Sequence, residues 1–242
     1  MPTDAPAVLA GFHALKHALR FGAEIERVLA VDPPALEALA ATLAPDLAGR
    51  FAALARPATR EELRALAPHL PATEVVALAR RPRVDPAVVL ADRGRGPVVL
   101  LEDPRHLGNV GAAVRVAAAA EAQAVLTTGE RDPWDAAALR GSAGLHFALP
   151  VARVGGAIDT AGRALVALDP AGDPFEAAAL PDDAVLAFGS ERHGLGAALL
   201  ARADARVALP MRAGVSSLNL ATTVAAVLYL MRDAARDRKS VV

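Results

Sequence analysis

Short apolar runs alternate with longer alanine-rich and polar stretches along most of the chain. The runs at 98–101 and 184–188 contain no polar position, which is typical of strands covered on both faces of a sheet. The stretches between such runs, 109–120 among them, are rich in helix-forming alanine. This order of strand and helix predicts an α/β fold.

The second half of the chain predicts one parallel sheet with its connecting helices. Its strands are expected at 98–101, 124–127, 148–151, 164–168, 184–188 and 206–209. Its helices are expected at 109–120, 135–140, 196–202 and 217–236. In such sheets, ligands bind where the strands end.

The first half predicts a smaller alternating α/β unit. Its helices are expected at 10–21, from Pro33 to about residue 43, and at 60–67. Its strands are expected at 25–31, 50–55 and 74–79. Gly22 is placed to end the first helix, and Thr59 with Glu62 forms a capping box for the third.

Residues 80–96 are rich in arginine, proline and glycine, apart from the short apolar segment 86–91. This composition predicts a linker at 81–96 between a domain at 1–80 and a domain at 97–242. Two interpretations of its arginines remain open. They belong to a solvated connector, or they contact phosphates, whose oxygens match the guanidinium fork. These arginines are Arg80, Arg81, Arg83, Arg93 and Arg95.

Composition narrows the classes of function. The 242 residues carry a formal net charge of −1 and only 3% aromatic residues, so any affinity for RNA must come from local patches. The chain has no cysteine, which excludes disulfides and cysteine zinc sites. His13 and His17 lie one helical turn apart without an evident third ligand, so no metal is expected. No leader is evident at residues 1–10, and 218–230 is too short to span a bilayer, so a cytoplasmic protein without membrane contact is expected.

Three segments place small or polar residues where a strand gives way to a helix. The first segment is 109–115, from Asn109 to Arg115; the second is 189–195, with Gly189, Ser190 and Glu191; the third is 209–220. The third begins Leu209-Pro210-Met211 and ends Ser216-Ser217-Leu218-Asn219-Leu220. Taken singly, each has an ordinary interpretation: Asn109 as a helix cap, Glu191 in a solvated turn, and Ser216 or Ser217 capping the last helix.

The three segments together resemble the motifs of the SPOUT superfamily of RNA methyltransferases, in particular its SpoU/TrmH-like ribose 2′-O-methyltransferases. The resemblance covers residues 97–236. In many members a shorter gap precedes the asparagine of the first motif, whereas here Arg105-His106-Leu107-Gly108 separates Asp103-Pro104 from Asn109. The resemblance implies a deep trefoil knot, a homodimer, S-adenosylmethionine as cofactor, and an N-terminal domain like ribosomal protein L30e that binds RNA.

The resemblance also implies site roles. Arg115 is implied to be catalytic, as a general base or as a stabiliser of charge. Because a guanidinium rarely gives up its proton, stabilisation of the developing alkoxide and of the neighbouring phosphate is favoured. Asn109, Glu191, Ser217 and Asn219 would orient the reacting groups. The residues implied to bind the methyl donor are Gly189, Ser190, Leu209, Met211 and Leu218. Structured RNA is the implied substrate, with ribosomal RNA preferred over transfer RNA.

Other functions fit less well. No Gly-x-Gly-x-x-Gly follows the first strand of the second half, as a Rossmann dehydrogenase would require, and no Gly-x-Ser-x-Gly elbow marks an α/β-hydrolase. The alternative that stays open is a non-catalytic RNA-binding relative that retains the fold.

Overall fold

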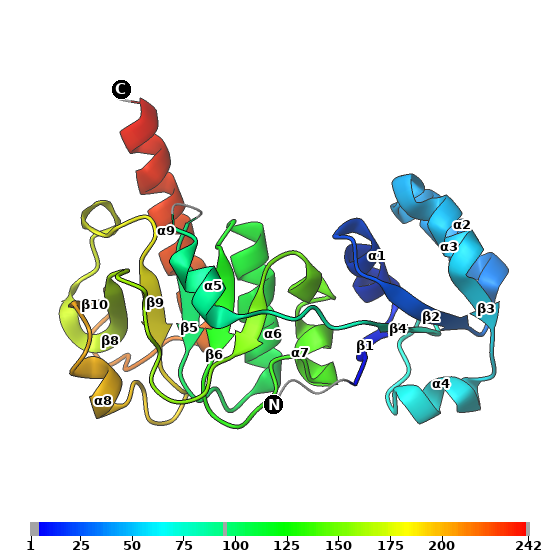
Figure 1. The fold of residues 1–242 in the computed structure, drawn as a ribbon, viewed down its shortest axis with the longest axis horizontal. Coiled ribbons are helices and arrows are strands. Elements are labelled where there is room, and N and C mark those ends of the chain that lie inside the picture. Colours follow the sequence, from blue (N-terminus) through cyan, green and yellow to red (C-terminus); the bar gives the residue numbers. More distant parts are fainter. Residues whose placement is uncertain (1–4, 94–95, 241–242) are drawn as a thin grey trace.

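In the computed structural model the chain forms two α/β units, each built on its own sheet (Figure 1). The structure describes residues 5–93 and 96–240. The larger sheet has six strands in the order β10-β8-β9-β5-β6-β7, and all of its pairings are parallel. Its strands are β5 (Val98–Leu101), β6 (Ala124–Thr127), β7 (Val151–Arg153), β8 (Leu165–Pro174), β9 (Val185–Phe188) and β10 (Ala205–Ala208). The predicted α/β fold with a parallel sheet is confirmed.

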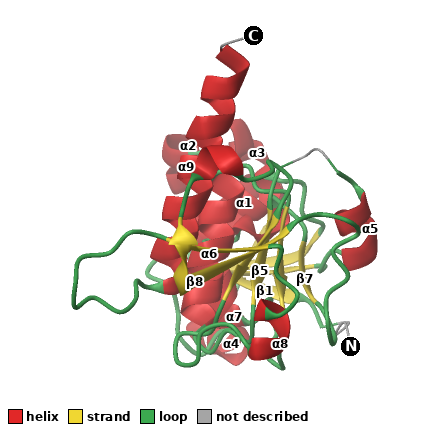
Figure 2. Ribbon diagram, turned by 90° about the vertical axis from the view of Figure 1, so that its left-hand side faces the viewer, coloured by secondary structure: helices red, strands yellow, loops and turns green. Residues whose placement is uncertain are grey.

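Helices cover both faces of the larger sheet (Figure 2). They are α5 (Pro86–Ala91), α6 (Leu107–Ala119), α7 (Ala136–Gly141), α8 (Ala197–Leu200) and α9 (Leu220–Ser240), with 3-10 turns at Leu145–Phe147 and Ala177–Ala179. Val99 and Leu101 of β5 belong to the core formed with α6 and α9, whereas Val98 and Leu100 belong to the core formed with α5 and α8. Successive strand residues point to opposite faces, so double coverage explains why all four are buried.

The smaller sheet has the order β1-β4-β2-β3. Its strands are β1 (Ala7–Ala10), β2 (Ile25–Ala30), β3 (Ala55–Pro57) and β4 (Val75–Ala79). Its helices are α1 (Phe12–Arg20), α2 (Pro33–Leu43), α3 (Ala48–Leu54) and α4 (Arg60–Leu66), with a 3-10 turn at Pro45–Leu47. β4 pairs antiparallel with β1 and β2, and β3 pairs parallel with β2, so this sheet is mixed. The predicted capping box of Thr59 and Glu62 is confirmed at the start of α4.

The predicted strand at 50–55 is wrong, and strand β1 was not predicted. Residues 48–54 form α3, whose Phe51 is fully buried and stacks on Phe12 at 5.1 Å between ring centroids. Leu47, Phe51 and Leu54 recur at helical spacing, a signal that the short apolar run concealed. β1 precedes Gly11, which has φ 98° and allows the abrupt turn from the strand into α1.

Several element boundaries in the larger unit differ from the prediction; β8, for example, continues to Pro174 rather than ending at 168. The strand expected at 148–151 begins at Val151, because residues 145–147 form a 3-10 turn and Pro150 has no N–H to pair. α6 begins at Leu107 rather than 109. α9 begins at Leu220 rather than 217.

The two units share a continuous apolar core, which runs from α1 and β1 into α6 and α7. At their contact, a Cβ on Gly144 would lie 2.3 Å from the carbonyl oxygen of Ala14. His17 Nδ1 lies 2.8 Å from the carbonyl oxygen of Ala143. α7, which contacts the smaller unit, is itself pressed against α6, since a Cβ on Gly111 would lie 2.1 Å from the carbonyl oxygen of Ala138. Glycines therefore set the spacing at both contacts.

The segment expected as a linker contains helix α5, whose Leu90 is buried against the larger sheet. Arg80 pairs with Glu24, Arg81 with Asp132 and Arg93 with Asp183. Arg95, the remaining cation of the Gly-Arg stretch, lies outside the described residues. The structure thus gives three of these arginines carboxylate partners within the chain, as expected for a structural connection.

Arg163 joins this segment to the larger unit. Its guanidinium is almost completely buried and donates to the carbonyl oxygens of Leu90, Asp92 and Asp183 at 2.7–2.8 Å. It also donates to Gln123 Oε1 at 2.7 Å. Because buried donors and acceptors are costly when unpaired, this set of bonds fixes the end of α5 against the sheet.

His146 is a second buried polar group, between Pro133 and Ser142. Its Nε2 lies 2.8 Å from the carbonyl oxygen of Pro133, and its Nδ1 lies 2.7 Å from Ser142 Oγ. The carbonyl accepts only, so Nε2 carries the proton and Nδ1 accepts from the serine in the neutral ring. Burial lowers the pKa of His146 to about 4, against an ordinary value of 6.5.

No helix in the described ranges is long and apolar enough to cross a bilayer.

The pKa of His146 predicts loss of stability in acid. The folded-state pKa lies below the unfolded value, so the unfolded chain binds the proton more tightly. The contribution is therefore complete above pH 6.5 and is lost as the pH falls toward about 4. The difference in free energy of unfolding between wild type and His146→Gln should shrink by about 3 kcal/mol between about pH 7.5 and pH 4. Urea titrations of both proteins measure this difference, and an unchanged difference would contradict the assignment.

Candidate functional site

The three segments meet at the carboxyl ends of β9, β5 and β10, around a cavity of about 710 Å³ that we call the strand-end cavity. The second segment follows β9, the third runs from β10 into α9, and Asn109 lies in the first turn of α6. The lining includes nine of the residues singled out from the sequence: Asn109, Gly189, Ser190, Glu191, Leu209, Met211, Ser217, Leu218 and Asn219. Parallel pairing explains the convergence, because it brings all strand ends to one edge of the sheet.

Gly189 forms the floor of the turn after β9. A Cβ at this position would lie 2.1 Å from the carbonyl carbon of Gly194. Ser190 and Gly194 exchange backbone hydrogen bonds of 3.0 Å in both directions. Glu102 holds the far end of the same loop by accepting from the amide of Gly196 at 2.6 Å. The loop is thus closed by backbone contacts that only a residue without a side chain permits at 189.

A chain of hydrogen bonds joins the three segments across the cavity mouth. Asn219 Nδ2 donates to Asn109 Oδ1 at 3.2 Å, and Asn109 Nδ2 donates to Glu191 Oε1 at 2.8 Å. Glu191 Oε2 accepts from the backbone amide of Arg105 at 3.2 Å. We call this set the Asn–Asn–Glu chain.

The Asn–Asn–Glu chain keeps Glu191 ionised. Partial burial raises the pKa of this carboxyl, but the hydrogen bonds from the Asn109 side chain and from backbone amides outweigh it. The net effect is a pKa below the ordinary value of 4.5. Glu191 is therefore a carboxylate at neutral pH and accepts hydrogen bonds without donating any.

Asn219 begins α9, and the serines do not. Its Oδ1 accepts from the amides of Ala221 at 2.9 Å and Thr222 at 3.4 Å, which is the geometry of an N-cap. The interpretation of Ser216 or Ser217 as the cap is therefore wrong. Ser217 is exposed and lines the cavity instead.

Arg115 does not line the strand-end cavity of its own chain. It lies on α6 six residues after Asn109, and at 100° per residue the two side chains point about 120° apart. Arg115 is exposed and makes no hydrogen bond or ion pair with any described residue. The pKa of His17 on α1 is lowered mainly by burial, and the charge of Arg115 lowers it further.

The structure adds lining residues that the sequence analysis did not single out, chief among them His106, Asp169, Pro170 and Arg192. β8 leaves β10 between Ala167 and Asp173, where the register shifts, and Asp169 pairs with Arg206 at 2.7 Å in this bulge. The signal available was a charged residue directly after the apolar run 165–168. Within the residues that the structure covers, no three His, Cys, Asp or Glu side chains gather as metal ligands.

Comparisons with known proteins agree on one family. The model of the SpoU rRNA methylase family matches residues 96–229. An uncharacterised tRNA/rRNA methyltransferase of Mycobacterium tuberculosis is 33% identical over 201 residues, which cover 78% of this chain and 69% of that protein. The 23S rRNA (uridine(2479)-2′-O)-methyltransferase of Streptomyces viridochromogenes is 34% identical over 158 residues, which cover 59% of this chain and 53% of that protein.

Among solved structures, the SpoU methyltransferase AviRb of Streptomyces viridochromogenes, in complex with the cofactor AdoMet, matches with a TM-score of 0.75. The two are 26% identical, and the match covers 98% of this chain and 91% of that one.

The close approach at Gly189 predicts that a single methyl group there disrupts the loop. Gly189→Ala should lower the free energy of unfolding by about 1–3 kcal/mol, because the added Cβ overlaps the backbone of Gly194. Gly108→Ala is the matched control, since a Cβ at Gly108 meets no atom within 4 Å. Urea unfolding compares the two, and equal midpoints for Gly189→Ala and wild type would show that the loop yields without cost.

Proposed function

Because the chain belongs to the SpoU rRNA methylase family, we propose that it transfers a methyl group from S-adenosylmethionine to a ribose 2′-hydroxyl of structured RNA. The observation that carries this proposal is the strand-end cavity with the Asn–Asn–Glu chain at its mouth. Ribosomal RNA is the preferred substrate class, since relatives from Streptomyces and Bacillus subtilis carry the name of 23S rRNA 2′-O-methyltransferases.

The residues of the strand-end cavity fit the proposed donor. Its volume of about 710 Å³ lies in the range of small-molecule sites. Leu209, Met211 and Leu218 offer apolar surface to a nucleobase, and the close backbone contact of Gly189 with Gly194 fixes the shape of the loop beside them. Once bound there, the donor would supply an activated methyl group on a sulfonium.

The chain's own residues would position the acceptor. Each side-chain amide has two N–H donors, and the Asn–Asn–Glu chain uses one from Asn109 and one from Asn219. The remaining N–H of each is free to hold a ribose oxygen at the mouth of the cavity. Glu191, kept ionised, fixes the orientation of Asn109. Such positioning supplies a large part of the rate in a displacement between two bound groups.

Arg115 is the proposed stabiliser of the alkoxide that forms as the ribose hydroxyl loses its proton. A guanidinium keeps its proton in proteins, so electrostatic stabilisation is the role its chemistry favours. Because Arg115 lies off the cavity of its own chain, we propose a homodimer in which Arg115 of the partner subunit completes each site. Its exposure and lack of a partner among the described residues support this arrangement.

The proposal extends to the whole chain. Residues 1–80 would form an L30e-like domain that binds RNA, residues 81–96 a linker stiffened by α5, and residues 97–242 a catalytic domain with a deep trefoil knot. The match to AviRb over nearly the whole chain supports this organisation. A cytoplasmic location would follow from a ribosomal RNA substrate.

Two measurements test the proposed activity. S-adenosylmethionine at about 100 times its Kd should raise the free energy of unfolding by about 3 kcal/mol, because it binds only the folded chain. Incubation with the donor and unmodified large-subunit rRNA should then yield one new ribose 2′-O-methyl group, found by mass spectrometry of the nuclease digest. A stabilising donor without any RNA methylation would favour the non-catalytic relative, and absence of both effects would refute the proposal.

The dimer proposal predicts complementation between two inactive variants. Arg115→Ala should abolish methyl transfer with donor affinity nearly unchanged, whereas Gly189→Ala should lose donor binding. If Arg115 acts across the dimer, unfolding and refolding a 1:1 mixture should restore about a quarter of the wild-type activity, because half the dimers are mixed and each has one complete site. Full activity of Arg115→Ala alone would refute the role, and a mixture without activity would place Arg115 and the cavity on the same subunit.

A further inference from the structure

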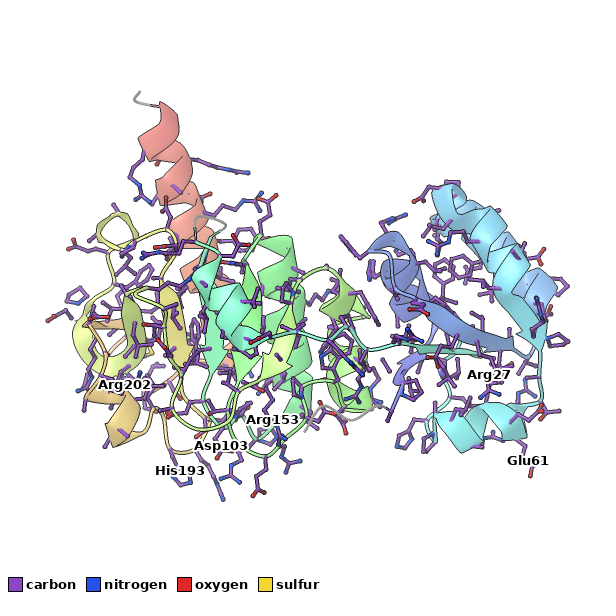
Figure 3. All side chains as sticks on the ribbon, in the orientation of Figure 1. Arg27, Glu61, Asp103, Arg153, His193 and Arg202 are labelled. Carbon is purple, nitrogen blue, oxygen red and sulfur yellow. The ribbon has the colours of Figure 1, made fainter. Side chains whose placement is uncertain are left out.

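A second, smaller cavity of about 390 Å³ lies beside the strand-end cavity, and we call it the basic cavity. Its lining residues are Arg105, His106, Arg192 and His193. The first two come from the loop between β5 and α6, and the last two from the loop between β9 and α8. In Figure 3, Asp103 and His193 mark these two loops at the lower edge of the larger unit.

The charge of the basic cavity is available to a ligand. Arg192 is exposed and makes no hydrogen bond or ion pair with any described residue. Arg105 pairs with Asp103 at 2.9 Å, but half of its side chain is exposed, so this ion pair is screened by water and weak. The other nearby carboxylate, Glu191, already accepts from Asn109 and from the backbone amide of Arg105.

The start of α6 adds to the positive potential. His106 is the N-cap of this 13-residue helix and forms no side-chain hydrogen bond that caps it. The first amides of a helix have no partner within it and carry the positive end of its dipole. Anions are favoured at such ends, and here the end opens beside two guanidinium groups.

We propose that the basic cavity holds a backbone phosphate of the RNA, next to the nucleotide whose ribose is methylated. His106 and Arg192 line both cavities, so a phosphate held here lies directly beside the reacting group. Guanidinium forks and imidazole N–H groups suit phosphate oxygens. The inference rests on the proposed function and deepens it.

Arg105 and His193 are the residues to change, because they line the basic cavity and not the strand-end cavity. We expect the variant R105A/H193A to bind unmodified large-subunit rRNA about tenfold more weakly than wild type. The slope of log affinity against log KCl concentration, measured by filter binding from about 50 to about 200 mM, should fall by about one for each lost phosphate contact. KM for the RNA should rise while kcat at saturating RNA and the Kd for S-adenosylmethionine stay near the wild-type values.

Arg236→Ala is the matched control, since it removes an exposed arginine from the C-terminal turns of α9, at the opposite edge of the molecule (Figure 1). It should bind RNA with the wild-type slope. Arg105→Lys with His193 intact should retain most of the affinity for RNA. A phosphate contact depends mainly on the positive charge, which lysine keeps, and less on the two-pronged geometry of the guanidinium.

The outcomes separate this inference from the proposed function. If RNA binding depends on the basic cavity but no methyl transfer occurs, the phosphate site is upheld and the proposed methyltransferase activity is refuted. Methyl transfer with R105A/H193A binding RNA as wild type does would refute the phosphate site alone. Loss of donor affinity in R105A/H193A would also refute it, because these residues would then act through the strand-end cavity.

Discussion

Parallel pairing of β9 with both β5 and β8 is the constraint on which the rest of the structure depends. Together with the parallel pairing of β10 with β8, it makes the chain leave β5, β9 and β10 at the same edge of the sheet, although the segments are separated by as many as 110 residues in sequence. In the Asn–Asn–Glu chain, Asn109 and Glu191 follow the adjacent strands β5 and β9, and the long segment after β10 brings Asn219 to them. Covering the sheet on both faces is the condition for this pairing, and it explains why the strands are uniformly apolar while the chemistry lies in the loops.

The buried polar side chains stabilise the fold, whereas two exposed arginines do not. Arg163 lies in the interior with its guanidinium N–H groups bonded to backbone carbonyls and to Gln123, and it fixes the segment that joins the two units. His146 lies in the interior as a neutral ring between a carbonyl and a hydroxyl. Both side chains serve the architecture, whereas Arg115 and Arg192 remain exposed and without partners among the described residues. In the proposed function, the exposed guanidinium groups of Arg115 and Arg192 are therefore the ones available to RNA.

Much of the larger unit was predictable because its signals are local. Uninterrupted apolar runs indicated β5, β6 and β9, and the small and polar residues after them indicated the strand-end cavity. α3 was mistaken for a strand because a seven-residue run with one aromatic residue fits both periods, and only the pairing of Phe51 with Phe12 decides between them. Asp169 and the basic cavity escaped prediction for a different reason: they depend on a register shift in β8 and on the meeting of two loops, neither of which a single sequence encodes locally. The orientation of Arg115 relative to Asn109 was predictable from helix geometry, and it is the reason for proposing that the partner subunit completes the site.

The glycine contacts between α6 and α7 have a consequence for target selection. Gly111 lets α7 lie against the helix that carries Asn109. α7 in turn contacts β1 of the smaller unit, and Gly144, after α7, contacts α1. No side chain separates these backbones, so the offset between the smaller unit and the strand-end cavity is set by van der Waals contact rather than by a hinge. In the proposed function, the two units therefore work as a spacer of fixed length: where the first unit grasps the RNA decides which nucleotide reaches the second.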